Sequence, residues 1–355
     1  FGPLEDDLEL AVLIVVGDNI STGHIMPAGN RVLRYSSNNP ARSRIRVARD
    51  PLSNLYLPVY AGDYTAAECA ARFLPDARRL AEALFRHEPF ASRRTDFNLW
   101  GLCPPSAESG VARPSTGTQR RTPVGATYDA FGSERYVLTF DNRELRDVAA
   151  WAPYEFIAIL VNAATYGGGG IHGTFATVAV DSDWADYLFV HEFGHHFAGL
   201  ADEYYTSPVA YAPAATVVEP WEANVTALLD GAPPKWADLV ATGTPVPTPW
   251  PKQEFEERQR AFQALRKQIR AANRPEAEMS ALFREERAFT TSLFQGHRHA
   301  DAVGAFRGAN YDAQAYYRPQ LDCVMFTRDE VPFCRVCQRA LEQVIDWDAG
   351  PRRPD

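Results

Sequence analysis

Apolar residues in the first half of the chain fall into short runs that are typical of strands. Such runs occupy residues 55–60, 97–102 and 156–161, and the last of them, Phe-Ile-Ala-Ile-Leu-Val, is apolar at every position. A strand that is apolar on both faces is typical of the middle of a sheet covered by helices on both sides. We therefore expect residues 156–161 to form a central strand.

Helical patterns alternate with these strands. Residues 65–87 begin with a Thr-x-x-Glu capping box and are predicted to form a helix that is kinked or divided at Pro75. Residues 141–151 are predicted to form a second helix with Asp141 as its N-cap. The alternation of strands and helices indicates an α/β arrangement. Residues 1–52 are predicted to be a β-rich segment, because short strand-like runs lie at residues 11–16 and 44–47.

Four consecutive glycines, residues 167–170, precede a predicted strand at residues 174–180. A run of this kind marks either a flexible loop or a place where another backbone comes close, and we favour the second interpretation. If the strand lies at the edge of the sheet, it can hold an extended peptide through main-chain hydrogen bonds.

The second half of the chain changes character twice. Prolines and tryptophans indicate irregular structure after residue 205, and residues 252–294 then show apolar residues at helical spacing among many Glu, Arg and Gln. We interpret residues 252–294 as an inserted antiparallel pair of helices separated at Pro275. Its charges are most simply a solvated face, and the alternative is a partner-binding surface. Near the C-terminus, Met325 precedes a final helix that opens at Pro332.

Composition excludes several classes of partner. The 355 residues are 46% hydrophobic, which is ample for a core, and the net charge of −9 comes without any dense Lys/Arg tract. Nucleic acid and anionic membrane surfaces are therefore not expected as partners. No run approaches the roughly 18 apolar residues that span a bilayer. A protein or peptide substrate remains open.

The strongest chemical signal is the sequence His191-Glu192-Phe-Gly-His195. On a helix, two histidines four residues apart lie on one face, where their imidazoles can bind one Zn²⁺ ion. Glu192 beside them is then placed to act as the general base toward a metal-activated water. Apolar residues lead into this helix, and Gly199 is expected to end it in a left-handed conformation.

A catalytic zinc site needs a third protein ligand. The nearest candidates are Asp202 and Glu203, because a helix that ends at glycine returns the chain toward its own ligand face. We favour Asp202, with Glu203 as the alternative. A third possibility is that both are surface charges and that a distant glutamate completes the site.

The remaining histidines and cysteines have simpler interpretations. His196 points about 100° away from its neighbouring ligand and is expected to orient or pack rather than coordinate, and His172 is interpreted as a loop residue. Among the five cysteines, three lie close together near the C-terminus. A local disulfide is the favoured interpretation, ahead of half a zinc site or buried free thiols. These three are Cys323, Cys334 and Cys337. His297 and His299 are interpreted as a solvated pair.

Beyond the pentapeptide, the chain resembles the metzincins, whose zinc sits above a methionine-containing turn. The resemblance rests on Gly199-x-x-Asp202 after the two histidines and on Met325 about 120 residues later. One extra residue separates His195 from Gly199 relative to the metzincin pattern. The Gly-x-x-Asp interval itself is preserved.

A fuller match identifies the chain as similar to the IgA-peptidase family of zinc metallopeptidases, over roughly residues 55–345. The resemblance implies a secreted or cell-surface bacterial endopeptidase with one zinc ion, held by His191, His195 and a nearby carboxylate, and with Glu192 as base. It does not imply the substrate. The motifs that carry it are Gly-Asp-Tyr-Thr-Ala-Ala-Glu at 62–68, Pro-Ser-Ala-Glu-Ser-Gly-Val at 105–111, Tyr166 with its glycines, residues 191–205, Tyr-Arg-Pro at 317–319, Asp-Cys-Val-Met at 322–325 and Cys-Arg-Val-Cys at 334–337.

The expected fold is therefore an α/β (α+β) zincin with a metzincin-like catalytic domain: a mixed twisted sheet, an active-site helix, a Met-turn near residue 325 and a helical insertion. The predicted parts are the β-rich segment 1–52, a catalytic subdomain 53–200 and a C-terminal subdomain 201–355. Two alternatives to a zinc endopeptidase remain. One is an inactive peptidase-fold module that binds protein or glycan, and the other is a zinc amidase that acts on cell-wall peptides.

Overall fold

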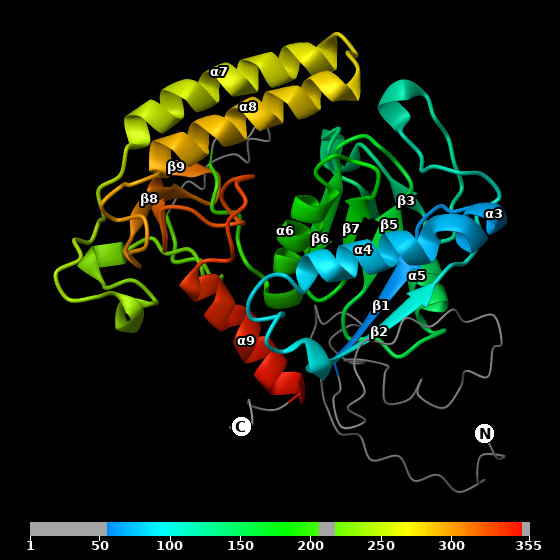
Figure 1. Ribbon diagram of the computed structural model, residues 1–355, viewed down its shortest axis with the longest axis horizontal. Coiled ribbons are helices and arrows are strands. Elements are labelled where there is room, and N and C mark those ends of the chain that lie inside the picture. Colours follow the sequence, from blue (N-terminus) through cyan, green and yellow to red (C-terminus); the bar gives the residue numbers. More distant parts are fainter. Residues whose placement is uncertain (1–54, 206–216, 350–355) are drawn as a thin grey trace, which may run out of the picture.

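The computed structural model describes residues 55–205 and 217–349 (Figure 1). The strands predicted at residues 11–16 and 44–47, and the whole of the predicted segment 1–52, lie outside the described residues.

A five-stranded sheet forms the centre of the N-terminal half. Its strand order is β2-β1-β5-β7-β6, and all neighbours are parallel except β6 and β7, which are antiparallel. The prediction of a central strand at residues 156–161 is confirmed by β5, which lies in the middle of the sheet. The strands are β1 (Leu55–Ala61), β2 (Phe97–Leu102), β5 (Ala158–Val161), β6 (Gly168–Ile171) and β7 (Phe175–Ala179).

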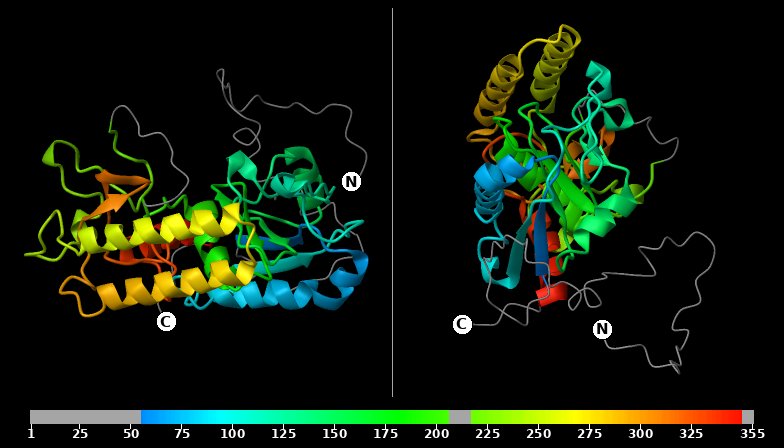
Figure 2. Two further views of the ribbon diagram at one scale, coloured as in Figure 1. Left: turned by 90° about the horizontal axis from the view of Figure 1, so that it is seen from above. Right: turned by 90° about the vertical axis from the view of Figure 1, so that its right-hand side faces the viewer.

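Helices cover both faces of the sheet, as the apolar pattern of β5 requires. Leu160 packs into the larger core, which β5 shares with helices α4 (Leu74–Leu84) and α6 (Ala185–Ala198). Ile159 packs into a second core on the other face, together with residues of α5 (Asn142–Ala149). Figure 2 shows the sheet between these layers.

The predicted helix at residues 65–87 is present and begins at the predicted capping box, which Thr65 forms with Glu68. It runs without a break through α3 (Ala66–Glu68) and a π-helical turn, η1 (Cys69–Phe73), into α4. Pro75 follows the π-helical turn directly, so the predicted irregularity near Pro75 is a local change of helix type and does not divide the helix in two.

The glycine run is a strand rather than a loop, and another backbone does come close to it. A Cβ atom on Gly170 would collide with the main-chain oxygen of Glu192 and lie 2.8 Å from Cβ of His195. A Cβ on Gly168 would lie 2.7 Å from the carbonyl oxygen of Thr177. Glycine therefore lets β6 pack directly against α6.

The expectation of an edge strand at residues 174–180 is wrong. Because the glycine run folds back antiparallel to β7, it covers that strand and becomes the edge itself. The outer side of β6 is partly paired, since the Gly168 N–H donates to the carbonyl of Arg135 over 3.1 Å and the Gly168 carbonyl accepts from Val137 N–H over 3.1 Å.

Two long helices, α7 (Lys252–Ala271) and α8 (Glu276–Phe294), lie side by side across the top of the molecule (Figures 1 and 2). The predicted pair of helices divided at Pro275 is present. The pair is anchored to the N-terminal half, because the Glu276 carboxylate accepts the Tyr166 N–H over 3.0 Å. Glu286 of α8 also forms an ion pair with Arg328 at 2.8 Å.

The C-terminal region contains a hairpin and a last helix. Strands β8 (Phe306–Ala309) and β9 (Asp312–Arg318) pair antiparallel, and α9 (Arg335–Ala349) packs against α6. Helix α9 begins at Arg335 rather than at Pro332. The short elements are η2 (Arg94–Asp96), η3 (Pro114–Thr116), β3 (Ala126–Thr127), η4 (Ala130–Gly132), β4 (Leu138–Thr139), η5 (Leu229–Gly231) and η6 (Ala237–Leu239).

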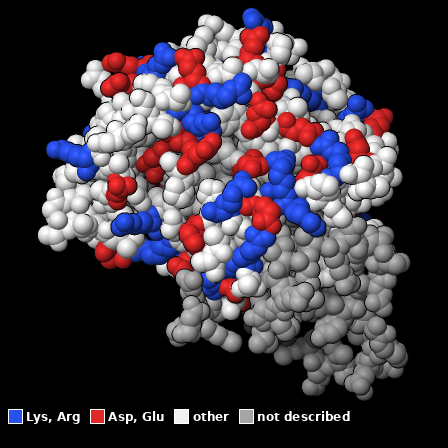
Figure 3. Space-filling view, viewed as in Figure 1, with Lys and Arg blue, Asp and Glu red and all other residues white. Residues whose placement is uncertain are grey.

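Within the described ranges, no helix is long and apolar enough to cross a membrane. Acidic and basic side chains are intermixed over the face shown in Figure 3 rather than separated into fields of one sign.

One buried carboxyl group lies at the end of β1. Asp63 is fully buried, its Oδ1 accepts the N–H of Asn162 over 2.8 Å, and its Oδ2 has no hydrogen-bond partner. Burial raises the pKa of Asp63 to about 7, with a further contribution from the negative charge of Glu68. The folded protein therefore keeps a proton that the unfolded chain releases near pH 4.

This shift predicts a pH dependence of stability. The contribution of Asp63 is fully present below about pH 4 and is lost as the pH rises through about 7, because only the folded state holds the proton in that window. We expect Asp63→Asn to gain stability relative to the wild type on going from about pH 5 to about pH 8. Denaturant unfolding at both pH values measures the difference. An equal difference at the two values would contradict the assignment.

Candidate active site

Helix α6 presents the two histidines of the sequence motif. It is buried along most of its length, and it ends at Gly199, whose φ of 59° is left-handed. The predicted helix end is therefore confirmed. Glycine is required there for a second reason, since a Cβ would lie 2.8 Å from Cζ3 of the Trp221 ring. The chain then turns back toward the histidines.

Three ligand-type atoms converge at this turn. His191 Nε2 lies 3.1 Å from His195 Nε2, and Asp202 Oδ1 lies 3.1 Å from the first and 3.2 Å from the second. The three side chains can hold one metal ion between them.

The protons of both histidines are on the opposite ring nitrogens. His191 Nδ1 donates to the carbonyl of Val324 over 3.0 Å, and His195 Nδ1 donates to the carbonyl of Leu200 over 2.5 Å. A carbonyl can only accept, so each Nδ1 must carry the hydrogen and each neutral imidazole presents a lone pair at Nε2. Two lone pairs and a carboxylate oxygen therefore face one another, and this arrangement is favourable only around a positive charge.

The electrostatics of the cluster agree with this conclusion. When no metal ion is bound, a proton on an imidazole Nε2 takes its place. Burial opposes a charge on Asp202, but protonated His195 and a hydrogen bond from a protonated imidazole hold the pKa of this carboxyl well below its usual range. Burial likewise opposes protonation of His195, but the charge and hydrogen bond of Asp202, the charge of Glu192 and the Leu200 carbonyl together raise the pKa of His195 to about 9. The centre attracts a cation, whether a proton or a metal ion.

Asp202 is oriented by a tyrosine that sequence reasoning missed. The Tyr311 hydroxyl donates to Asp202 Oδ2, and it contacts the hydroxyl of Tyr204 at 3.1 Å. Arg135 Nη2 donates to Tyr204 over 3.1 Å. A carboxylate held on one oxygen in this way keeps the other oxygen aimed at the histidines.

Tyr311 lies in the two-residue turn between β8 and β9. Asn310 and Tyr311 have φ values of 49° and 62°, the left-handed pair that a type I′ hairpin turn requires. Asn310 is a common residue at the first of these positions, and this was the available sequence signal. Tyrosine at the second is strained, and such strain is typical of functional sites.

Glu192 lies beside the ligands and faces the cleft. A Cβ on Gly168 would come within 3.3 Å of Glu192 Cγ, so the glycine edge strand leaves space for this side chain. Two hollows in the surface meet at His191 and Glu192. One runs along β6 toward Tyr311, and the other runs beneath α7 and α8.

Met325 lies under the helix rather than among the ligands. It is fully buried, and its Sδ would be 3.0 Å from a Cβ on Gly194. The same turn carries the Val324 carbonyl that accepts from His191. Met325 therefore packs against the helix that carries the two histidines.

Glu203 faces away from the histidines. Its Oε1 lies 3.2 Å from Sγ of Cys337 and 3.7 Å from Sγ of Cys334. The expected local disulfide is wrong, because Cys323, Cys334 and Cys337 are free, and the sulfurs of the first and last are 3.9 Å apart, whereas a disulfide bond is about 2.0 Å long. A disulfide joins Cys69 and Cys103 instead.

Four further histidines, His172, His196, His297 and His299, lie outside the cluster of His191, His195 and Asp202. His196 is fully buried, and its Nε2 accepts the Ile157 N–H over 3.0 Å while its Nδ1 donates to the Ile171 carbonyl. Burial lowers the pKa of His196 to about 3, so it stays neutral. His172 packs against the Trp221 ring, and His297 accepts the N–H of His299.

Comparison with known proteins agrees with the resemblance seen in the sequence. None of the curated proteins compared with the chain matches it. The sequence model of one family, described as IgA Peptidase M64, matches residues 44–345, which is most of the chain. The chain therefore belongs to the IgA peptidase M64 family.

Proposed function

We propose that the protein is a zinc-dependent endopeptidase with His191, His195 and Asp202 as ligands and Glu192 as general base. The family supports a peptidase, and the observation that carries the finer proposal is the convergence of three electron-pair donors at 3.1–3.2 Å. In a tetrahedral zinc site with bonds of about 2.0–2.1 Å, neighbouring ligand atoms lie about 3.3 Å apart. The donor set therefore fits Zn²⁺ with one position left open.

The surroundings support a metzincin-like arrangement. The ligand helix ends at a left-handed glycine, the third ligand follows on the returning chain, and Met325 lies beneath the helix. Both imidazoles donate Nδ1–H to carbonyls, and such outer hydrogen bonds orient and strengthen histidine ligands.

The mechanism follows from the position of Glu192. A zinc ion held by His191, His195 and Asp202 would act as a Lewis acid toward a peptide carbonyl and would lower the pKa of a water molecule to about 7. Glu192 takes the proton of the attacking water and delivers it to the leaving amine. Its place between β6 and the ligand helix keeps its carboxylate at the junction of the two hollows.

The two hollows support cleavage within a chain rather than at its end. They extend in different directions from His191 and Glu192, so a peptide can continue on both sides of the scissile bond. Along β6, the Gly167 carbonyl accepts from Ala179 N–H, and antiparallel alternation then turns the main-chain groups of Gly170 away from β7. These groups can pair with an extended substrate.

The hollow beneath α7 and α8 supports a preference for acidic residues. Arg266 is almost fully buried there, and its Nε and Nη2 have no hydrogen-bond partner. Its nearest carboxylate, Glu134, is 3.9 Å away. Burial and the neighbouring charges of Arg135 and Arg328 lower the pKa of Arg266 to about 10. An anionic substrate group would compensate this crowding of positive charge.

The disulfide Cys69–Cys103 supports an oxidising compartment, in agreement with a secreted or cell-surface bacterial enzyme.

Removal of the base is the first test. We expect Glu192→Gln to lower kcat/KM for peptide hydrolysis by about 10²-fold or more, because general-base catalysis is lost, while zinc stays bound. Zinc content and digestion of an extended-peptide library, with products identified by mass spectrometry, measure both. Glu254→Gln, at an exposed position of α7, is the matched control. Undiminished cleavage by Glu192→Gln would refute the mechanism.

The third ligand is tested by a series. Asp202→Asn should lose zinc from the site, and Tyr311→Phe should weaken zinc binding about tenfold or more, because the carboxylate loses its outer hydrogen bond. Competition with a chromophoric chelator gives the affinities. Tyr317→Phe removes a hydroxyl from the same hairpin that contacts Arg307 instead, and it should bind zinc normally. Equal zinc affinities for all three variants would argue against Asp202 as the third zinc ligand.

Substrate preference is tested with paired peptides that differ by Glu or Gln at one position. We expect the wild type to favour the Glu peptide by about tenfold at one position on either side of the cleaved bond. Arg266→Gln should abolish this preference while its kcat/KM for the Gln peptide changes little. Arg260→Gln, exposed on the same helix, is the control. A preference that survives Arg266→Gln would exclude the proposed pocket.

A further inference from the structure

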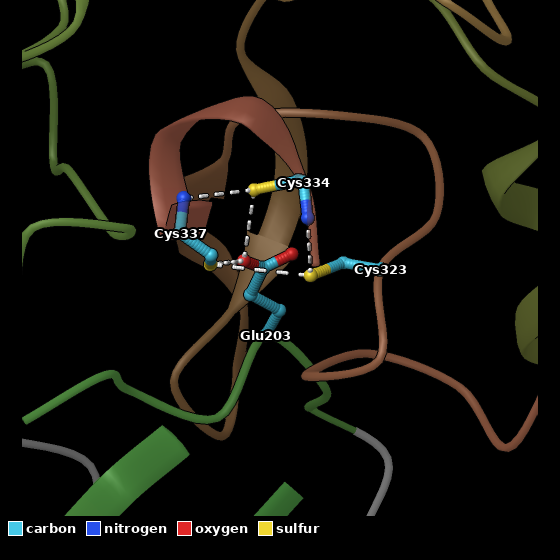
Figure 4. A group of neighbouring side chains, drawn as sticks. All are labelled: Glu203, Cys323, Cys334 and Cys337. Atoms are coloured by element: carbon cyan, nitrogen blue, oxygen red, sulfur yellow. Dashed lines mark hydrogen bonds between the residues drawn. The ribbon is translucent and has the colours of Figure 1, made fainter. Parts of the chain in front are cut away.

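A second group of side chains of the kinds that bind metal ions includes Glu203, the residue that follows Asp202 (Figure 4). It consists of Glu203, Cys323, Cys334 and Cys337, all of them buried. Their sulfur and carboxylate oxygen atoms lie within 4.8 Å of one another. They come from three separate segments: the chain after α6, the turn that carries Met325, and the start of α9 (Figure 4).

The spacing of these atoms fits a tetrahedral ion. With metal–sulfur bonds of about 2.3 Å and a metal–oxygen bond of about 2.0 Å, sulfurs lie about 3.8 Å apart and sulfur lies about 3.5 Å from oxygen. The sulfurs of Cys323 and Cys337 are 3.9 Å apart. Glu203 Oε1 is 3.7 Å from the sulfur of Cys334 and 3.2 Å from that of Cys337.

The carboxylate of Glu203 is buried, and hydrogen bonds within the protein do not satisfy both of its oxygens. Glu203 is fully buried, and Asn224 Nδ2 donates to its Oε1 over 3.0 Å, but its Oε2 has no hydrogen-bond partner. A buried carboxylate in this condition is costly unless a positive charge compensates it. Arg318 is buried nearby and interacts electrostatically with Glu203, but its Nη atoms donate to backbone carbonyls.

Backbone N–H groups point at two of the three sulfurs. The N–H groups of Cys334 and Met325 point at the sulfur of Cys323, at 3.2 and 3.5 Å. The N–H of Cys337 points at the sulfur of Cys334, at 3.4 Å. Cys334 and Cys337 also lie at the N-terminus of α9, where the helix dipole favours negative charge.

We propose that Cys323, Cys334, Cys337 and Glu203 form a second metal site that binds Zn²⁺ in a structural role. Three thiolates select a soft or borderline ion, and four protein ligands in tetrahedral spacing leave no position for a substrate or water. The site is therefore closed, in contrast to the open site on α6.

This second site would hold in place the segments that orient the first. Glu203 directly follows Asp202, and its N–H donates to the Met325 carbonyl over 2.9 Å. Cys323 directly precedes Val324, whose carbonyl accepts from His191. One ion thus links the chain carrying the third catalytic ligand to the turn that orients the first histidine.

The decisive experiment uses His195→Ala, which removes a ligand of the first site and leaves the cysteines intact. We expect two zinc ions per chain in the wild type and one in His195→Ala, measured by elemental analysis after removal of loosely bound metal. After replacement of zinc by Co²⁺, His195→Ala should show intense near-ultraviolet absorption from sulfur-to-cobalt charge transfer. A variant without bound metal, or without this absorption, would overturn the proposal.

Variants of the cysteines give the complementary result. Cys337→Ser in the His195→Ala background should lose the remaining metal and the charge-transfer absorption, whereas Cys69→Ser/Cys103→Ser in the same background should keep both. Intact mass under denaturing, non-reducing conditions should show one disulfide in the wild type. A second disulfide among the three C-terminal cysteines would refute the site, and it would do so even if Cys337→Ser failed to fold.

The outcome is separable from that of the proposed function. Metal bound by His195→Ala with sulfur ligation would support the second site even if the wild type cleaved no peptide.

Discussion

The hydrogen bonds from His191 and His195 to backbone carbonyls determine what kind of ion the candidate active site can bind. His191 and His195 each donate Nδ1–H to a carbonyl, and this fixes the orientation of both rings. The Nε2 atoms of the neutral rings therefore direct their lone pairs toward each other and toward Asp202. Three electron-pair donors at such short range repel one another unless a cation lies between them. The carbonyls belong to Val324 and Leu200, which lie far apart in the chain. The site therefore forms only when both of these segments are correctly positioned.

The parts that could be predicted from the sequence were those with a local physical signature. The spacing of His191 and His195 and the left-handed Gly199 each follow from helix geometry, and a strand apolar on both faces has to be central. Tyr311 could not be found in this way, because it meets Asp202 from a hairpin more than 100 residues later and tyrosine has no spacing rule there. Which strand became the edge depended on how the glycine run folds back, and this is a tertiary property.

The helical pair shows why charge patterns underdetermine function. Many charged residues of α7 and α8 are exposed, as expected for a solvated face, yet Arg266 and Gln259 on α7 are buried and line the hollow that opens at Glu192. A helical pattern assigns residues to faces but does not say what each face meets. The cysteines illustrate the same limit, since spacing alone favoured a disulfide, whereas in the structure the three sulfurs are not bonded to one another and the carboxylate of Glu203 joins them.

Asp202 and Glu203 are neighbours in the chain after α6, yet their side chains reach different clusters. Asp202 contacts the imidazole of His191, and Glu203 contacts the sulfur of Cys337. The end of the helix at Gly199 therefore determines which of the two carboxylates reaches which cluster. Deleting one residue between Gly199 and Asp202 would put Glu203 in the place of Asp202 and Tyr204 in the place of Glu203. Inserting one residue would put Ala201 and Asp202 in these two places, so in either case one of the two clusters would lose its carboxylate. Sequence variation in this short loop is thus restricted to changes of residue type at constant length.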